Sequence, residues 1–475
     1  MLYNLLLAAS IALCALAAGV IYLRARNRLS VKGNASTRQP TVVFLHPDLG
    51  IGGAERLIID AAMGLLRHQS VISPPPQVIL VTTYHDPNRA FPETTDGSVR
   101  VVVYGNAFPR TIFNRGHVLC ATVRMWIAAV RSCIAYPEAA CFVVDQVAAA
   151  LPVLALVSPG SRRLFYCHFP DMLCDPSRGS ANERSMLHRV YRAVFDRVEE
   201  RTMQCAQCLM FNSQFTRSIT LTTFPRLKSC SSNAKMAEDV LYPPVDLSIA
   251  DKDVSNARAN NSQCDSTNIS PKALSDLLSR TSCFVSINRF ERKKGIDLAI
   301  EAFCRIRKDS SIDGIRPPLH LVIAGGFDHR LEENVREFDR LRSLALSKGL
   351  RPDEDITFLR SFSNDHKLIL LKCSTGILYT PIGEHFGIVP IEGMACGAMV
   401  VATATGGPLE SVGQGDICGF LREPTPEAFA EAMLKILRLT SAQRSSIGNA
   451  ARARCAALFS MRVFSSNLAK HINPM

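Results

Sequence analysis

Charge is scarce in this sequence: 20% of its 475 residues are Asp, Glu, Lys or Arg, whereas 47% are hydrophobic. A chain with so much apolar surface and so little charge can bury large cores, so general disorder is excluded. At this length we expect two folded domains rather than one.

The sequence also lacks any basic run with interleaved aromatic residues, so nucleic acid is not supported as a partner. The net charge is nevertheless +12, with a pI near 9.1. The anionic partners that remain are a phospholipid surface and a substrate that carries a diphosphate.

No disulfide framework or metal-binding pattern is evident among the sixteen cysteines. They are spread singly through apolar segments, which favours reduced thiols in a protein core. Cys205 and Cys208 form one C-x-x-C, but no second pair or His-x-x-x-His accompanies it. Asp353-Glu354-Asp355 precedes a predicted strand at its amino end and is interpreted as surface charge. The sequence therefore predicts no metal and no cofactor.

Leu5 to Leu23 contains no charge and can span most of the roughly 30 Å hydrocarbon core of a bilayer. No Lys or Arg precedes this run, and four follow it at once: Arg24, Arg26, Arg28 and Lys32. By the positive-inside rule, this order predicts an uncleaved anchor over residues 1–23, with the rest of the chain in the cytosol. A cleaved signal peptide, the alternative, has the opposite charge order. N-x-S sequons begin at Asn34, Asn260 and Asn268.

Short apolar runs alternate with helical intervals after the anchor, which predicts an α/β protein with two doubly wound parallel sheets in two Rossmann-like domains. In the first domain, strands are expected at 41–46, 77–83, 99–104, 141–145, 163–168 and 208–212. In the second, they are expected at 283–288, 319–324, 356–359, 375–379 and 399–403. The predicted layout is a linker over 24–39, a first domain over 40–245, a polar linker over 246–280, a second domain over 281–440 and a helical segment over 441–475.

Two carboxylates eight residues apart, Glu384 and Glu392, bracket a predicted strand-to-helix junction. Free amides near Gly387 and Ile388, together with the positive end of the helix dipole, suit a phosphate group. Glu392 lies about two turns into the helix, where it can accept hydrogen bonds from a ribose diol, and Glu384 lies nearer the sugar. Two glutamates at this spacing are usually part of a solvated helix, so the pattern needs support from elsewhere.

That support comes from Arg289 and Lys294, which follow the first predicted strand of the same domain. Arg289 can bind a diphosphate in bidentate fashion, and Lys294 adds a point charge. Because ligands of open α/β sheets bind beyond the carboxyl ends of the strands, phosphate binding is favoured over a solvated basic loop. The solvated loop is the interpretation kept for Arg292 and Lys293.

In the first domain, Gly50, Gly52 and Gly53 follow the first strand and let the backbone approach a ligand closely. Their spacing is not the G-x-G-x-x-G of a dinucleotide site, and Asp86 lies farther on than about 20 residues, so a dehydrogenase is a weak alternative. His168 ends a predicted strand and can position a sugar or polarise a hydroxyl; the alternative is a structural loop histidine.

Together these segments resemble the retaining glycosyltransferases of family 4, whose GT-B fold has two Rossmann-like domains facing a cleft. The resemblance covers nearly the whole chain. The family's motifs fall on Arg289, Lys294 and Gly295, on Glu384, Phe386, Gly387 and Glu392, and on Gly52 and Gly53. More narrowly, residues 44–56, 165–171, 211–216 and 242–246 resemble the dolichol-pathway mannosyltransferases that add α-1,3- and α-1,6-linked mannose.

This resemblance implies GDP-mannose as donor and mannosyl-chitobiose on dolichyl diphosphate as acceptor, at the cytosolic face of the endoplasmic reticulum membrane, alongside other glycosyltransferases of lipid-linked oligosaccharide assembly. It implies a front-face retaining route in which the leaving diphosphate helps to deprotonate the attacking hydroxyl; a covalent intermediate on Glu384 is the alternative. The catalytic residues would be Glu384, His168, Arg289 and Lys294. The donor would be bound by Gly52, Gly53, Phe386, Gly387, Ile388 and Glu392.

Two other functions stay open. One is a family 4 relative that uses a UDP-sugar, and the other is a noncatalytic membrane-bound partner of such enzymes. The complete set of charged motif residues argues against the second, since a degenerate site usually loses charge first. One departure from the resemblance is the carboxyl-terminal stretch 459–475, which mixes apolar and charged residues instead of forming a strongly apolar segment.

Overall fold

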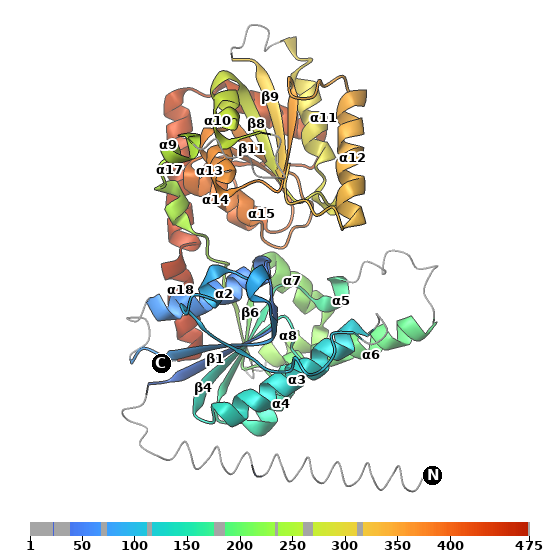
Figure 1. Ribbon diagram of the computed structural model, residues 1–475, viewed down its shortest axis with the longest axis vertical. Coiled ribbons are helices and arrows are strands. Elements are labelled where there is room, and N and C mark those ends of the chain that lie inside the picture. Colours follow the sequence, from blue (N-terminus) through green and yellow to red (C-terminus); the bar gives the residue numbers. More distant parts are fainter. Residues whose placement is uncertain are drawn as a thin grey trace. The chain divides into compact units, whose positions relative to one another are not determined.

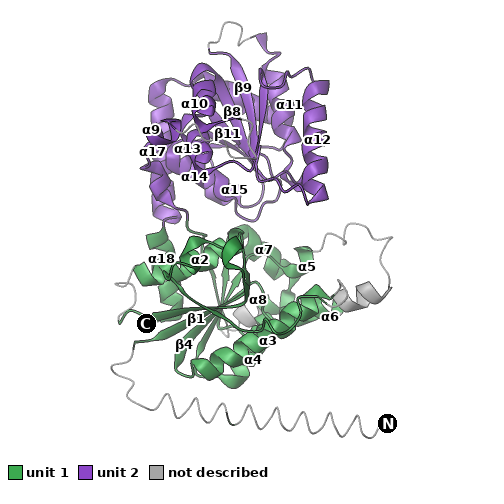
Figure 2. Cartoon of the chain, viewed as in Figure 1, with its two compact units in different colours: residues 1–244, 461–475 green, residues 245–460 purple. Residues whose placement is uncertain are grey.

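The computed structural model describes residues 39–67, 74–111, 116–174, 186–232, 236–259, 269–310 and 317–473, together with Tyr22. The chain forms two compact units (Figure 2). Unit 1 comprises residues 1–244 and 461–475, and unit 2 comprises residues 245–460. The predicted anchor lies outside the described residues apart from Tyr22, and so does the basic linker apart from residue 39.

Unit 1 contains a seven-stranded sheet in the order β3-β2-β1-β4-β5-β6-β7, with every neighbouring pair parallel. Its strands are β1 (Thr41–Leu49), β2 (Gln77–His85), β3 (Arg100–Val103), β4 (Ala139–Asp145), β5 (Arg162–Cys167), β6 (Cys208–Phe211) and β7 (Ala237–Val240). The first six are confirmed. The edge strand β7 was not predicted, because two of its four residues are acidic and give no apolar signal.

Helices cover both faces of this sheet (Figure 1). They are α2 (Gly53–Arg67), α3 (His117–Ala135), α4 (Ala150–Val157), α5 (Asp171–Cys174), α6 (Met186–Met203), α7 (Gln214–Thr223), α8 (Pro225–Ser232) and α18 (Met461–Ile472), with the 3-10 turns η2 (Pro87–Arg89) and η3 (Pro92–Thr94). Val42 and Phe44 of β1 share one core with α2 and α18, whereas Val43 and Leu45 share the other with α3 and α4. Successive strand residues face opposite sides, so a strand covered on both faces is continuously apolar.

By length and composition alone, α3 is the one helix among the described residues that is long and apolar enough to cross a membrane. Core helices of soluble proteins pass the same test, and 44% of its most apolar window is buried in unit 1.

Unit 2 contains a six-stranded parallel sheet in the order β10-β9-β8-β11-β12-β13. Its strands are β8 (Ser282–Ile287), β9 (Leu319–Gly325), β10 (Ile356–Arg360), β11 (Gly376–Tyr379), β12 (Val400–Thr403) and β13 (Phe420–Arg422). The first five are confirmed, and β13, only three residues long, was not predicted. The helices are α9 (Val254–Ala259), α10 (Pro271–Arg280), α11 (Asp297–Ile306), α12 (Glu332–Ser347), α13 (Asn364–Cys373), α14 (Ile388–Cys396), α15 (Pro408–Ser411), α16 (Pro426–Arg438) and α17 (Ser441–Leu458), with the 3-10 turns η5 (Leu247–Ala250) and η6 (Arg292–Lys294).

The stretch 246–280 differs from the linker that the sequence predicts. It belongs to unit 2, and its last third is the helix α10. Ser270 caps α10 by accepting from the Ala273 amide, and Leu274 and Leu278 are buried. The polar residues before Ser270 obscured this short amphipathic helix in the sequence.

The terminal stretch 441–475 is helical as predicted, but it divides between the units. Helix α17 belongs to unit 2, whereas α18 belongs to unit 1. Phe464, Leu468 and Ile472 of α18 repeat every four residues and are buried in the core that α2 also covers. This apolar stripe accounts for the return of the chain to its first unit.

Strand order reverses between β1 and β4 in unit 1 and between β8 and β11 in unit 2. In open parallel sheets, ligands bind outside the carboxyl ends of the strands at such a reversal. These two points are therefore where functional side chains are expected.

Candidate active site

In unit 2, Lys294 and Glu384 meet at the strand reversal. Lys294 ends the turn η6, which follows β8, and Glu384 follows β11, the neighbouring strand. The Lys294 ammonium forms an ion pair with the Glu384 carboxylate, and their side chains are only 14% and 22% exposed. Burial raises the pKa of Glu384, but Lys294, together with His385 and Lys293, outweighs burial and leaves that pKa below its ordinary value. The sequence predicted both residues, and the structure brings them into contact.

The start of α14 follows Glu384 closely in the chain. Gly387 has a φ of 84°, and a Cβ there would lie 3.0 Å from the Tyr379 ring, so glycine is required on both counts. Phe386 is buried and packs edge-on against Phe459, with 5.6 Å between ring centroids. The predicted helix start at Ile388 is confirmed, and its free amides suit an anion.

The loop that follows β12 supports the loop between β11 and α14 that carries Glu384. The sequence analysis did not predict this support. The Thr403 hydroxyl donates to the Pro381 carbonyl at 2.5 Å, and the Gly407 amide donates to the Glu384 carbonyl at 2.7 Å. A Cβ on Gly407 would lie 2.3 Å from Phe386 Cα. The glycine pair that closes this loop directly after β12 was the available signal.

Arg289 lies just beyond the carboxyl end of β8, as predicted. Its side chain is 65% exposed and forms an ion pair with Glu291 at 3.0 Å. Gly325 ends the neighbouring strand β9, and Gly326 follows it. A Cβ on Gly325 would lie 1.8 Å from the Asn288 carbonyl oxygen, and one on Gly326 would lie 3.5 Å from Arg289 Cγ, so the two glycines leave room for this loop. The exposed guanidinium can exchange its carboxylate partner for an anionic ligand.

Glu392 lies in the second turn of α14 and is 15% exposed. Its carboxylate forms an ion pair with Lys367 of α13 at 2.6 Å. The structure therefore gives Glu392 a protein partner that sequence reasoning did not foresee, and the ribose contact stays a prediction.

Asp355 was wrongly interpreted as surface charge. Its side chain is 6% exposed, with Arg307 and Arg351 both 3.0 Å from its carboxylate. Two guanidinium partners allow a carboxylate to be buried, whereas Asp353 and Glu354 are exposed as expected. Within the described part of the chain, no group of three or more His, Cys, Asp or Glu residues is arranged to hold a metal.

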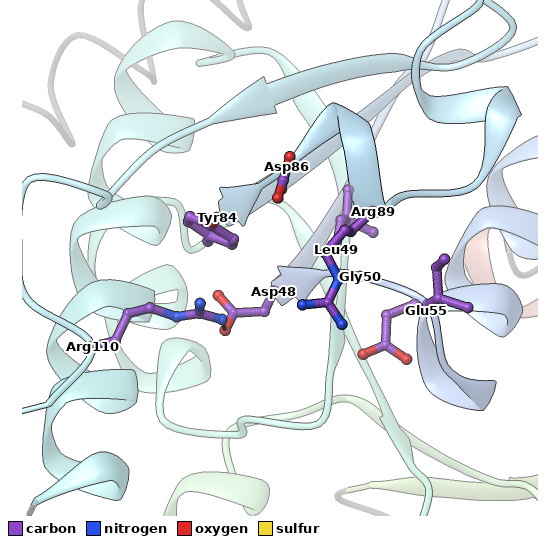
Figure 3. Close-up of a pocket in the computed structure, with 9 residues that line it drawn as sticks. Asp48, Leu49, Gly50, Glu55, Tyr84, Asp86, Arg89 and Arg110 are labelled. Atoms are coloured by element: carbon purple, nitrogen blue, oxygen red, sulfur yellow. Dashed lines mark hydrogen bonds and ion pairs between the residues drawn. The ribbon is translucent and has the colours of Figure 1, made fainter. Parts of the chain in front are cut away.

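In unit 1, Gly52 precedes α2 and Gly53 begins it. The end of β1 from Asp48 and the loop after it line a cavity of about 390 Å³, together with Tyr84 near the end of β2 and residues that follow this strand (Figure 3). Arg110 reaches into this cavity, forms an ion pair with Asp48 and lies over the Tyr84 ring, 4.2 Å from its centroid. This cavity offers carboxylates, guanidinium groups and an aromatic ring, which are the groups that bind sugars.

His168 follows β5 in unit 1. Its Nε2 atom lies 2.7 Å from Oδ1 of Asp145, whose other oxygen lies 2.8 Å from His46 Nδ1. Asn212 also donates a hydrogen bond of 3.0 Å to the His168 carbonyl. Sequence reasoning selected His168 but not Asp145 or His46; the signal was that polar residues occur at or near the carboxyl ends of three buried strands.

Known proteins resemble the chain over nearly its whole length. The family model of glycosyl transferases group 1 matches residues 275–454. The human α-1,3/1,6-mannosyltransferase ALG2 is 38% identical over 446 residues, which cover 93% of this chain and 97% of that protein. ALG2 of Dictyostelium discoideum is 38% identical, covering 91% of this chain and 97% of its own.

Solved structures support the fold alone. The sucrose-phosphate synthase of Thermosynechococcus elongatus has a TM-score of 0.63 at 19% identity, covering 91% of this chain and 98% of that one. The trehalose 6-phosphate synthase of Burkholderia multivorans has a TM-score of 0.66 at 13% identity, covering 92% of this chain and 96% of that one.

Two doubly wound parallel units, each with polar side chains at its strand reversal, define a glycosyltransferase with the GT-B fold. An enzyme of this class takes a sugar-nucleotide donor. The chain belongs to the α-1,3/1,6-mannosyltransferase family, since its curated relatives match it over nearly its whole length.

Proposed function

We propose that the chain transfers mannose from GDP-mannose to mannosyl-chitobiose on dolichyl diphosphate, adding one α-1,3- and one α-1,6-linked mannose. The observation that most supports this is the identity with α-1,3/1,6-mannosyltransferases over 93% of the chain. The setting is lipid-linked oligosaccharide assembly for protein N-glycosylation, at the cytosolic face of the endoplasmic reticulum membrane.

The charges of unit 2 act on the donor in this proposal. Lys294 and Arg289, with the amides near Gly387 and Ile388, stabilise the negative charge that grows on the leaving diphosphate. Preorganised groups of this kind contribute several kcal/mol to transition-state stabilisation. Glu384, held by Lys294, accepts a hydrogen bond from a hydroxyl of the donor sugar.

The configuration is retained because the acceptor hydroxyl attacks from the face that the diphosphate leaves. The leaving diphosphate takes the hydroxyl proton, so no protein carboxylate has to act as the base. His168 of unit 1 contacts a sugar hydroxyl, and Glu392 binds the ribose after its partner Lys367 moves away or joins the contact.

The test is to incubate membranes that carry the full chain with labelled GDP-mannose and the mannosyl-chitobiose lipid. Products are sized before and after digestion with linkage-specific mannosidases. Two added mannoses, one released by an α-1,3- and one by an α-1,6-specific enzyme, are expected. Transfer from a UDP-sugar instead would overturn the donor, and nucleotide binding without any transfer would favour a noncatalytic partner.

The orientation is tested separately through the three sequons. If unit 1 and unit 2 face the cytosol, Asn34, Asn260 and Asn268 stay unmodified in cells, and the chain sediments with carbonate-washed membranes. Glycosylation at any of the three sites contradicts the proposed orientation.

A further inference from the structure

Three titratable side chains meet at the strand reversal of unit 1. His46 is in β1, Asp145 ends β4 and His168 follows β5, and these strands are neighbours in the sheet. Leu45 pairs with Val144, which brings the next residues of β1 and β4 side by side. His46 and Asp145 therefore lie at one level of the sheet, whereas His168 lies two residues beyond Tyr166, the residue of β5 that pairs with Asp145.

Each carboxylate oxygen of Asp145 contacts one imidazole ring. Oδ2 lies 2.8 Å from His46 Nδ1, and Oδ1 lies 2.7 Å from His168 Nε2. The side chains of His46 and Asp145 are 0% exposed, whereas that of His168 is 22% exposed. Nε2 of His168 and Oδ1 of Asp145 are both buried and have no aligned hydrogen-bond partner among the described residues, so their 2.7 Å approach is an electrostatic contact, and the exposed surface of His168 belongs to the rest of its ring.

The backbone after Asp145 is strained. Gln146 has a φ of 59°, which is unusual for a residue other than glycine, and the Val147 amide donates to the Asp145 carbonyl at 2.7 Å. A tight turn of this kind costs free energy, as does a buried carboxylate. Neither feature is explained by stability, so both point to a function for Asp145.

Asp145 determines which nitrogens carry protons. Burial raises its pKa, but His168 and His46 outweigh burial and lower it to about 2, so the carboxyl group is ionised. An ionised carboxylate only accepts hydrogen bonds, and two lone pairs would repel at these distances. His46 must therefore present Nδ1–H, and His168 must present Nε2–H. A neutral His168 then keeps its lone pair on Nδ1.

We propose that Asp145, held in place by His46, is a positioning residue that fixes His168 in the Nε2-protonated tautomer, so that Nδ1 accepts a hydrogen bond from a sugar hydroxyl. The proposal deepens the proposed function and rests on it for the identity of the sugar. His46 occupies the second oxygen of Asp145 and so prevents the carboxylate from rotating away from His168.

The test compares two substitutions of the partly exposed His168. The amide of asparagine reaches roughly the position of Nδ1, and that of glutamine reaches the position of Nε2. We expect kcat of His168→Asn to be at least about tenfold higher than that of His168→Gln, with similar KM for the donor. Equal values, or the reverse order, would overturn the proposal.

A matched control exists in the same unit. His471 Nε2 lies 2.7 Å from Asp239 Oδ2 and is 17% exposed, but α18 places this pair away from the strand reversal. His471→Asn and His471→Gln should both keep the wild-type kcat, which separates the effect at His168 from the general loss of a histidine–aspartate pair.

A second readout does not depend on turnover. The full chain in detergent, labelled with ¹⁵N-histidine, is measured near pH 8.5, about two units above the ordinary pKa of imidazole. The His168 signal, identified by its loss in His168→Asn, should show the Nε2–H tautomer in the wild type and lose that preference in Asp145→Asn. An Nδ1–H tautomer or a doubly protonated ring in the wild type would overturn the proposal.

The two readouts separate the proposal from the proposed function. If GDP-mannose is not used, the donor assignment fails. The role of Asp145 is then still decided by the His168 tautomer and by the ratio of kcat for His168→Asn to kcat for His168→Gln, measured with the sugar nucleotide that the enzyme does turn over. If Asp145→Asn does not fold, the wild-type tautomer and the two His168 variants decide it.

Discussion

Lys294 and Glu384 illustrate what single residues contribute to the site. Both side chains are largely buried, and a buried ion pair contributes little net stability because desolvation offsets the attraction. Their contact is therefore better explained by the chemistry at the end of the sheet than by folding. Substituting either Lys294 or Glu384 leaves the charge of the other residue without this partner. We therefore expect the two residues to act as one unit.

Glu384→Gln and Lys294→Met should each lower kcat by about 100- to 1,000-fold, the range seen when one preorganised electrostatic group is removed. The double variant should lose little more, because effects within one unit are not additive. Initial rates with saturating GDP-mannose measure this. Glu301→Gln and Lys348→Met, which break an exposed pair of 3.8 Å, are the controls and should keep full activity. Additive losses would mean that the contact has no catalytic role.

The raised pKa of Glu199 predicts how the stability of unit 1 depends on pH. It accepts hydrogen bonds from the amides of Asp171 and Met172 at 2.7 and 3.0 Å, and burial raises its pKa from 4.5 to about 7. Between these values the folded state holds a proton that the unfolded chain has released. Stability therefore falls as pH rises through this window, by about 3 kcal/mol in total.

Glu199→Gln removes this penalty. Its melting temperature, measured by calorimetry, should exceed that of the wild type at pH 8 by more than it does at pH 5. Glu332→Gln, at an exposed position of unit 2, should change neither value. A gain that is equal at the two pH values would show that Glu199 does not titrate in this window.

At the scale of elements, the loop after β12 holds the loop that carries Glu384. This support comes from close backbone contact: Gly406 has a φ of 65°, and Gly407 leaves no room for a Cβ beside Phe386. Backbone that is packed this closely cannot move far, so the two loops are rigid. A side chain added at this contact would have to displace backbone. The donor site should therefore respond to changes in a loop that carries none of its charged residues.

Gly407→Ala should raise the KM for GDP-mannose at least about tenfold and destabilise unit 2 by about 1–3 kcal/mol, because the new methyl group overpacks the site. Donor titrations and thermal melts measure the two effects. Gly160→Ala, where a Cβ would meet nothing within 4 Å, is the control and should leave both unchanged. An unaltered KM would show that the two loops move independently.

At the scale of the whole molecule, the chain does not divide at a single point. It leaves unit 1 after residue 244 and returns to it at residue 461, so the stability of unit 1 depends on residues at both ends of the sequence. Leu468 of α18 is 1% exposed within the core that α2 covers.

Leu468→Ala should therefore destabilise unit 1 by about 2–5 kcal/mol, as other large-to-small core substitutions do. Protease cleavage after mild heating, mapped by mass spectrometry, should appear first in residues 39–244. Arg462→Ala on the exposed side of the same helix is the control. Cleavage that begins in unit 2 would contradict the assignment of α18.

Most of the fold and part of the site follow from the sequence alone. Strands buried on both faces are continuous apolar runs, so β1 and β8 were evident, and glycine, proline and charge at their ends located Glu384, Lys294 and Gly387 without coordinates. Short edge strands such as β7 and β13 have too few apolar residues to be recognised. Periodicity is a local signal, and local signals determine elements.

Only the tertiary structure decided which residues meet. Strand order brings Lys294 to Glu384 and joins His46 and His168 to Asp145, and the packing of α13 against α14 pairs Lys367 with Glu392. The partners in these contacts are 23 to 99 residues apart along the chain. No local pattern records such pairing, because burial and charge balance at each strand reversal are properties of the packed sheet.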